Sequence, residues 1–258
     1  AGRLAHGIFL DVLGRDAAIL PRIVALGDID EDELAFAEEA EPGGIVPLDI
    51  PPGLGELDRR LALARLVAAW AKRPVLSPLV VGGPASTLAL AGDLGRLIDD
   101  MVTRGVAWSA LDDLVPDQFD RYWQHTLEFL KIAREFWPAF LAEEYKIEPA
   151  ARRDMLIDAE AAHLAKHGDG PVIAAGSTGS MPATARFLHA VAKLANGAVI
   201  LPGLDTDLDD ESWEDIGGTR GPDGKFVIPP ASNHPQSAMH ALLDRFGIRR
   251  GHVEILGT

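Results

Sequence analysis

A short turn rich in glycine and hydroxyl groups, "GSTGS" at residues 176–180, follows an apolar segment and precedes a helical one. Strand-to-helix turns of this kind hold phosphate in P-loops and carry the nucleophilic serine in hydrolases. A P-loop ends in Gly-Lys-Ser/Thr, because the lysine must reach the β and γ phosphates. Met181 and Pro182 follow the turn here, so it is not a P-loop.

The turn also resembles a nucleophile elbow centred on Ser177, with Asp205 and His234 following in the chain order of α/β-hydrolases. An elbow helix begins directly after the serine. Pro182 would then fall beyond its first turn, where a proline costs about 3 kcal/mol. A serine hydrolase using Ser177 is therefore kept only as the alternative.

A noncatalytic corner accounts for the same residues. Ser180 is then expected to cap the helix, Pro182 to lie in its first turn, and Gly176 and Gly179 to permit the tight turn. Exposed amides at the helix start could bind a phosphate oxygen of a nucleotide or of DNA. The basic residues Arg152 and Arg153 could add positive charge to such a site, or they could simply form an exposed helix face. We predict no catalytic residue, and the candidate phosphate contacts are Gly176, Ser177, Thr178, Gly179, Ser180, Arg152 and Arg153.

The acidic stretch "LPGLDTDLDDESWED" is the second cluster that could do chemistry. An EF-hand loop counted from Asp205 requires glycine and glutamate where Asp210 and Ile216 stand. Asp209 or Asp210 is better suited to cap a short helix through "ESWEDI". The 8 histidines form no HExxH pair, and the chain has no cysteine, so we predict no metal site, disulfide or iron–sulfur cluster within it.

Helical spacing of apolar residues predicts one helix through "LAHGIFLDVL", ending at Gly14, and four more between residues 56 and 167. In the first of the four, the buried stripe is expected at Leu57, Leu61, Ala64 and Ala68, widened by Leu63, Val67 and Trp70. Ser86 or Thr87 is the expected N-cap of the second, which should stop at Gly105. Pro138 is expected to break or kink the third, and Gly168 to end the fourth.

The aromatic residues of this helical stretch are Trp123, Phe129, Phe136, Trp137 and Phe140. They could form a base-stacking surface. Their helical spacing suits core packing better.

The pattern changes after Gly170, where "PVIAAG", "PATARFLHAVAKLA" and "GAVILPGLD" predict strand, helix and strand, joined in a parallel crossover. Residues 23–26 could supply another strand of that sheet. A flexible Gly/Pro loop and a helix ending near Gly247, with Pro235 in its first turn, should follow. We expect an α/β domain in segments 1–55 and 169–258, interrupted by a helical subdomain at 56–168.

Composition narrows the function. The chain has 258 residues and a net charge of −15, which argues against a free-standing nucleic-acid binder. Eight acids and no base lie in residues 28–41, which we expect to be a solvated linker or, alternatively, a DNA mimic or docking strip for a basic partner. No apolar run is long enough to span a membrane, and a cytoplasmic protein is expected. Both ends look cut from a longer protein.

Several segments carry a resemblance to a known family. In chain order they are "AAILPRIVALGDIDEDEL", "LDRRLALARLVAAW", "WQHTLEFLKIAREFWPAFLAE", "PVIAAGSTGSMPATARFLHAVA", "AVILPGLDTDLDDESW" and "HPQSAMHALLDRFGIRR". They resemble the N-terminal part of the AddB family of alphaproteobacterial type, the B subunits of the AddAB helicase–nuclease that resects DNA double-strand breaks. The matches span nearly the whole chain.

The resemblance implies a superfamily-one helicase-like fold, in which a helical subdomain interrupts a RecA-like parallel sheet. It also implies a role in DNA repair and recombination, with AddA as partner and single-stranded DNA as ligand. The family's ATP-driven motor lies in the partner, and its Mg²⁺-dependent nuclease and iron–sulfur cluster lie far C-terminal. Gly176 and Ser177 stand where a motor has acidic residues. We therefore expect a noncatalytic scaffold with possible DNA contact, or otherwise a purely structural docking module.

Overall fold

A computed structural model describes residues 2–14, 17–19, 21–26, 50–72, 83–114, 121–168 and 170–256. The chain divides into two compact units, Ala1–Asp49 and Ile50–Thr258. The acidic segment 28–41 lies outside the described residues.

The first unit contains helix α1 (Gly2–Leu13), which ends at Gly14 in the left-handed conformation, as predicted. The prediction of a strand at residues 23–26 is wrong, because these residues form no regular structure. Ile23 and Val24 are about half exposed, at 43% and 46%. A short apolar run becomes a strand only when a neighbouring strand supplies hydrogen-bond partners.

The second unit begins with a helical block at residues 50–168. Its elements are α3 (Glu56–Ala71), α4 (Pro84–Arg104), the 3₁₀ helix η2 (Trp108–Leu114), α5 (Arg121–Lys131), the π-helical turn η3 (Ile132–Phe136), α6 (Trp137–Glu143) and α7 (Pro149–His167). One core joins α3, α4, the π turn and α6, with Leu63, Leu94, Ile132 and Trp137 fully buried. All four predicted helices are confirmed, the third with a π-helical turn inside it.

Helix α3 buries only part of the predicted face. Leu57 and Leu61 are 69% and 43% exposed, whereas Leu63, Val67 and Trp70 are buried. Leu, Val and Ala occur on most sides of this helix, so apolar spacing alone did not fix its orientation. Arg59, one turn before Leu63, fixes the orientation of the helix through its contacts with Gly95, Asp99 and Glu148.

A network of charged side chains crosses the helical block. Arg59 lies 2.9 Å from Asp99 Oδ1 and 3.0 Å from Glu148 Oε2, and it also donates to the carbonyl of Gly95. Glu148, 6% exposed, accepts from Trp137 Nε1 as well. The network therefore connects α3, α4, α6 and the residue that precedes α7.

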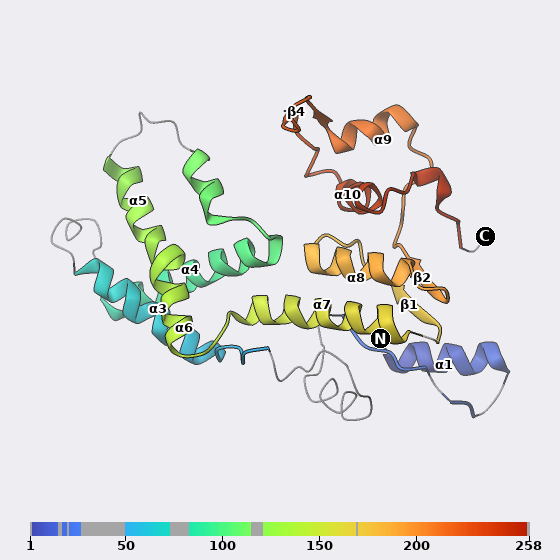
Figure 1. The fold of residues 1–258 in the computed structure, drawn as a ribbon, viewed down its shortest axis with the longest axis horizontal. Coiled ribbons are helices and arrows are strands. Elements are labelled where there is room, and N and C mark those ends of the chain that lie inside the picture. Colours follow the sequence, from blue (N-terminus) through green and yellow to red (C-terminus); the bar gives the residue numbers. More distant parts are fainter. Residues whose placement is uncertain are drawn as a thin grey trace. The chain divides into compact units, whose positions relative to one another are not determined.

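Two helix boundaries depend on prolines. Helix α4 begins at Pro84 with Gly83 as N-cap, so the predicted caps Ser86 and Thr87 are wrong. Pro84 takes the first helical position, where its missing amide leaves no hydrogen bond unmade. The predicted break or kink at Pro138 is a π turn at Ile132–Phe136, just before the proline. Trp137 donates to the carbonyl of Ile132, so α5 continues into α6 (Figure 1).

The aromatic residues mostly pack in the core, as predicted. Trp137 is buried and stacks on Phe140 at 5.3 Å, while Phe129 meets Trp70 edge-on at 5.0 Å. Phe136 differs, being 44% exposed on the π turn. The side chain of Trp123 lies outside the described residues.

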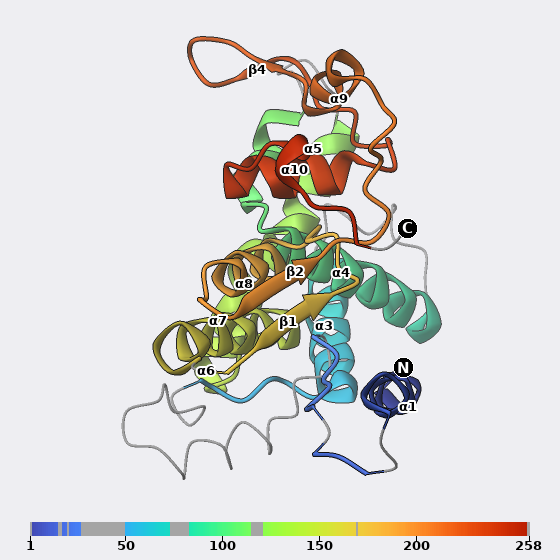
Figure 2. The ribbon, with the colours of Figure 1, turned by 90° about the vertical axis from the view of Figure 1, so that its right-hand side faces the viewer.

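The predicted strand, helix and strand are confirmed as β1 (Val172–Ala175), α8 (Pro182–Ala192) and β2 (Gly197–Ile200). The strands are parallel and in register from Val172 opposite Gly197 to Ala175 opposite Ile200 (Figure 2). α8 packs on β1, β2 and α7, and its Leu188 belongs to a buried cluster with Leu242. The described parallel sheet has two strands, and the fold is mixed α/β and mostly helical.

The last part of the chain contains α9 (Asp210–Gly217), a hairpin of β3 (Thr219–Arg220) and β4 (Phe226–Ile228), α10 (Ser237–Phe246) and the 3₁₀ helix η4 (Arg250–His252). The hairpin stands where we predicted a flexible loop. Helix α10 ends at Gly247 as predicted, but Pro235 precedes the helix rather than lying in its first turn. None of the described helices is both long and apolar enough to cross a membrane.

Candidate functional site

The glycine-serine turn has the backbone geometry that its sequence predicts. Gly176 and Gly179 have φ angles of 81° and 61°, a region that favours glycine. The amide of Gly176 donates to Ile200, extending the β1–β2 ladder by one hydrogen bond of 3.1 Å. The hydroxyl oxygen of Ser177 accepts from the amide of Gly179 at 3.2 Å, which closes the turn on itself.

Gly179 is also a point of close packing. The residue is buried, and a Cβ placed on it would lie 2.6 Å from Leu242 Cδ1 of α10 and 3.3 Å from Leu188 Cδ1 of α8. No side chain fits in that space without moving Leu242. The middle of the turn is therefore the surface against which α10 is packed.

The helix after the turn starts one residue later than predicted. Met181, not Ser180, is the N-cap of α8, because Pro182 occupies the first helical position. Ser180 is exposed and makes no side-chain cap. The next amides belong to Ala183 and Thr184, which are only 1% and 4% exposed. A phosphate has little access to the start of this helix.

The three residues of the hydrolase alternative make local contacts. Ser177 accepts from Gly179, and Asp205 Oδ1 accepts from the amides of Asp207 and Leu208 at 2.9 and 3.1 Å. Nδ1 of His234 accepts from the amide of Gln236 at 3.2 Å. Among the described residues, no hydrogen bond joins the three side chains to one another.

The two candidate arginines tie the start of α7 to neighbouring segments. Arg152 donates to the carbonyl of Pro51 at 3.1 Å. Arg153 donates to Asp154 at 3.1 Å and to Thr103, in the last turn of α4, at 3.3 Å. The positive charge of Arg153 therefore already has a carboxylate beside it.

The structure brings this arginine pair and the start of α8 to the same end of two adjacent helices. Gly105, directly after α4, lies against Pro182, and Arg153 reaches α4 through Thr103. Further along, Arg186 of α8 forms a bidentate pair with Asp158 of α7, at 2.8 and 2.7 Å. α7 and α8 thus run in the same direction, side by side (Figure 1).

A groove between α8 and α10, lined by two arginines and a histidine, is not evident from the sequence. Its volume is about 420 Å³, and it is lined by Pro182, Ala185, Arg186, His189, Arg245 and Phe246. The imidazole of His189 stacks on the ring of Phe246, with centroids 4.9 Å apart and planes 22° apart. Arg186 and His189 are three residues apart on one helix, a spacing that puts them on the same face. The contribution of α10 depends on tertiary packing and has no sequence signal.

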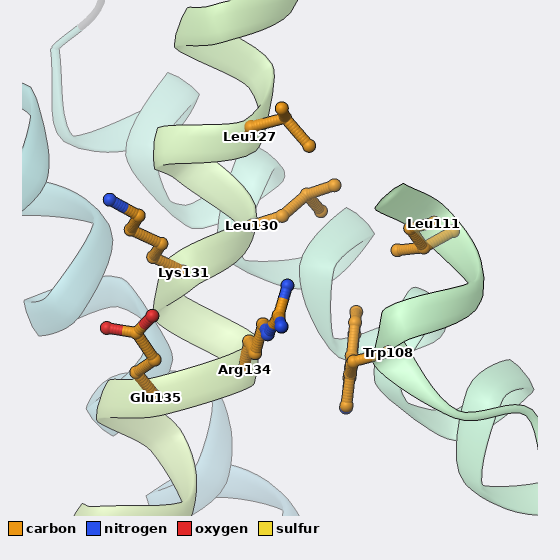
Figure 3. A pocket seen from close by; sticks show the side chains of 7 residues that line it. All are labelled: Trp108, Leu111, Leu127, Leu130, Lys131, Arg134 and Glu135. Atoms are coloured by element: carbon orange, nitrogen blue, oxygen red, sulfur yellow. The ribbon is translucent and has the colours of Figure 1, made fainter. Parts of the chain in front are cut away.

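A second cavity, of about 150 Å³, lies in the helical block (Figure 3). Its lining residues are Trp108, Leu111, Leu127, Leu130, Lys131, Arg134 and Glu135. Four of them are apolar, and Figure 3 shows Arg134 reaching into the gap between α5 and the 3₁₀ helix.

The acidic stretch forms a helix cap, as predicted. Asp209 is the N-cap of α9, where its carboxylate accepts from the amide and the hydroxyl of Ser212 at 2.8 and 2.7 Å. These hydrogen bonds lower the pKa of Asp209. Across the described residues, no three His, Asp or Glu side chains gather in a group that could hold a metal ion.

Comparisons with protein-family models, with curated proteins and with solved structures give no match to this chain.

Proposed function

We propose that this chain is the noncatalytic, helicase-like region of a DNA double-strand-break repair helicase–nuclease subunit of the AddB type. In this role it is a scaffold that also contacts single-stranded DNA. The proposal starts from the six segments that resemble that family. It is further supported by the order of structural elements, in which a helical block precedes a parallel strand, helix and strand.

The observation that carries the noncatalytic part is the packing of Gly179 against Leu242 and Leu188. A nucleophile elbow or a phosphate loop needs a turn whose reactive atoms face an open site. Here the centre of the turn is covered by α10, and the Ser177 oxygen accepts from the turn itself. The same residues are well explained as a corner that positions two helices.

The proposal includes a larger RecA-like sheet around β1 and β2. Parallel sheets are almost always covered on both faces. α8 covers one face of this pair, while Ile173 and Ile200 on the other face are 64% and 36% exposed. Further strands and a second helical layer would bury these residues.

The proposed partner is an AddA-type subunit, which would supply the ATP-driven motor. Mg²⁺ and an iron–sulfur cluster would belong to a nuclease domain elsewhere in the parent protein. This chain contains no cysteine to ligate such a cluster. The complex would act on DNA in the cytoplasm.

Co-expression with the AddA-type subunit of the same organism tests the scaffold role. We expect the tagged full chain to retain that subunit through affinity purification and gel filtration. Loss of the partner at moderate salt, with the chain still folded by circular dichroism, would contradict the proposal.

Titration with single-stranded DNA at several salt concentrations tests the DNA contact. Affinity that falls as salt rises indicates phosphate contacts. A chain that retains its partner but adds no DNA affinity would be a docking module only.

A further inference from the structure

We infer that the groove between α8 and α10 binds a phosphate group and stacks the base attached to it, as on a nucleic-acid strand or a nucleotide. The inference rests on the proposed function, since it assigns the DNA contact to particular side chains. It moves that contact from residues 176–180 and the pair Arg152 and Arg153 to Arg245, Arg186 and the rings of His189 and Phe246.

The start of α8 is a poor phosphate site, whereas the next turn of the same helix is better suited. Pro182 has no amide hydrogen, and the next two residues, Ala183 and Thr184, are buried. Arg186, one turn later, is half exposed and lines the groove. Positive charge is thus accessible where the backbone amides are not.

Arg186 is held in a fixed position in the groove wall. Its Nε and Nη2 donate to the two carboxylate oxygens of Asp158, and this pairing raises the pKa of Arg186. Its Nη1 makes no hydrogen bond within the described part of the chain. A guanidinium fixed along one edge can still donate from the other to a phosphate oxygen.

Arg245 supplies the cation that is not neutralised. It lies in the last turn of α10, is exposed, and forms no ion pair among the described residues. The nearby acids are Asp158 and Asp154, which face Arg186, and Asp244, the chain neighbour of Arg245. The charges balance closely enough that we expect only one or two phosphate contacts, and so a shallow dependence of affinity on salt.

The aromatic pair provides a surface for a base. His189 and Phe246 are stacked and half-buried, so each ring is fixed in place by the other. Strand-binding grooves combine cations along the backbone with rings on which bases stack. The groove has a volume of about 420 Å³, which leaves room for a nucleotide unit lying along the surface.

Fluorescence anisotropy with a short labelled oligo-dT strand tests the inference on the full chain at low and moderate salt. We expect Arg245→Gln to weaken binding about tenfold, the effect of losing one charge-assisted contact. Phe246→Leu should weaken it about five- to tenfold, since stacking of a base on a ring is lost. Thermal melting of each variant checks that it is folded.

Arg249→Gln is the matched control. Arg249 is also exposed and unpaired among the described residues and lies four residues further along, but it does not line the groove. It removes the same charge from the same region, so it should leave affinity within about twofold. Equal losses in Arg245→Gln and Arg249→Gln would overturn the groove assignment while leaving the proposed function standing.

Competition by thymidine monophosphate separates the two sources of the ligand. Displacement of the strand by the nucleotide assigns the groove to free nucleotides, and failure to displace it assigns the groove to the strand; both agree with a phosphate and base site. Displacement by inorganic phosphate at the same concentration would overturn the stacking role. A wild-type chain that binds no strand, alone or with its AddA-type partner, would overturn both this inference and the DNA contact in the proposed function.

Discussion

The helical block and the strand-containing region after it are held together in opposite ways. In the block, a largely buried cation, Arg59, contacts Glu148, Asp99 and the carbonyl of Gly95. In the later region, the critical residue, Gly179, has no side chain, and helix α10 packs directly on it. One region depends on pairing charged groups, and the other depends on leaving a small space empty.

The Arg59 network and the packing at Gly179 should tolerate mutation differently. A buried ion pair adds little net stability over an apolar replacement of the whole group, yet removing one partner leaves an uncompensated charge. A buried glycine has no partner to lose and is sensitive only to added atoms. Removing side-chain atoms should therefore destabilise the helical block most, and adding side-chain atoms should destabilise the turn most.

The largest effect is expected from Arg59→Met. The substitution keeps much of the side-chain volume but leaves Glu148 buried without its cation, at a cost of about 3 kcal/mol or more in unfolding free energy. Urea unfolding monitored by tryptophan fluorescence measures it. Arg96→Met is the control, because Arg96 pairs with Asp93 on the surface, and we expect a loss below about 1 kcal/mol. Equal losses in the two variants would mean that the network is unimportant.

Gly179→Ala should follow, with a loss of about 3 kcal/mol. The new Cβ would lie 2.6 Å from Leu242 Cδ1, and the φ of 61° adds backbone strain. Gly176→Ala is matched in strain, with a φ of 81°, but a Cβ there meets nothing within 4 Å. It should lose only about 1–2 kcal/mol.

A second variant separates overpacking from strain at the same turn. Shortening Leu242 to alanine makes room for the added methyl group, so Gly179→Ala should cost less in the Leu242→Ala background than in the wild type. A double-mutant cycle in urea gives the coupling. Strict additivity would show that close packing is not the reason for glycine at this position.

A smaller effect is expected at the ion pair where the two regions meet. Asp158 of α7 and Arg186 of α8 are 43% and 55% exposed, so Asp158→Asn should cost below about 1 kcal/mol despite the bidentate geometry. The loss should shrink further in high salt, as measured by thermal melting. A large loss of stability that does not change with salt would show that this pair behaves like the network around Arg59 instead.

The smallest effect concerns the cap of α9 and depends on pH. Hydrogen bonds from Ser212 lower the pKa of Asp209 in the folded chain below its unfolded value of about 3.9. The charged carboxylate therefore stabilises the fold at pH above about 4, and this contribution is lost as the pH falls through the folded pKa. Asp209→Asn retains a capping oxygen that does not titrate. The melting-temperature difference between the two proteins should vanish in acid, and a constant difference would contradict this account.

The order of elements could be predicted from the sequence, because it is determined locally. Apolar spacing located the helices, and Gly14, Gly105 and Gly247 ended three of them in the left-handed conformation. Helix starts were less accurate. Proline at the first helical position outweighed a nearby hydroxyl at both Pro84 and Pro182, which shifted the predicted caps.

Features that depend on distant parts of the chain could not be predicted. The buried face of α3 is oriented by Arg59, whose partners lie 40 and 89 residues away. The tight turn could be predicted, but the packing of α10 on that turn could not, because it depends on the contact between Gly179 and Leu242. The groove could not be predicted for the same reason, since Phe246 stacks on His189 and Arg245 lines the groove only when α10 packs on α8.

Labelling with a fluorophosphonate probe tests most directly whether the glycine-serine corner is structural rather than reactive. The full chain, its Ser177→Ala variant and an active serine hydrolase would be treated side by side and analysed by intact-mass spectrometry. We predict that only the hydrolase gains the mass of the probe. A stoichiometric adduct on the wild-type chain that disappears in Ser177→Ala would contradict the account.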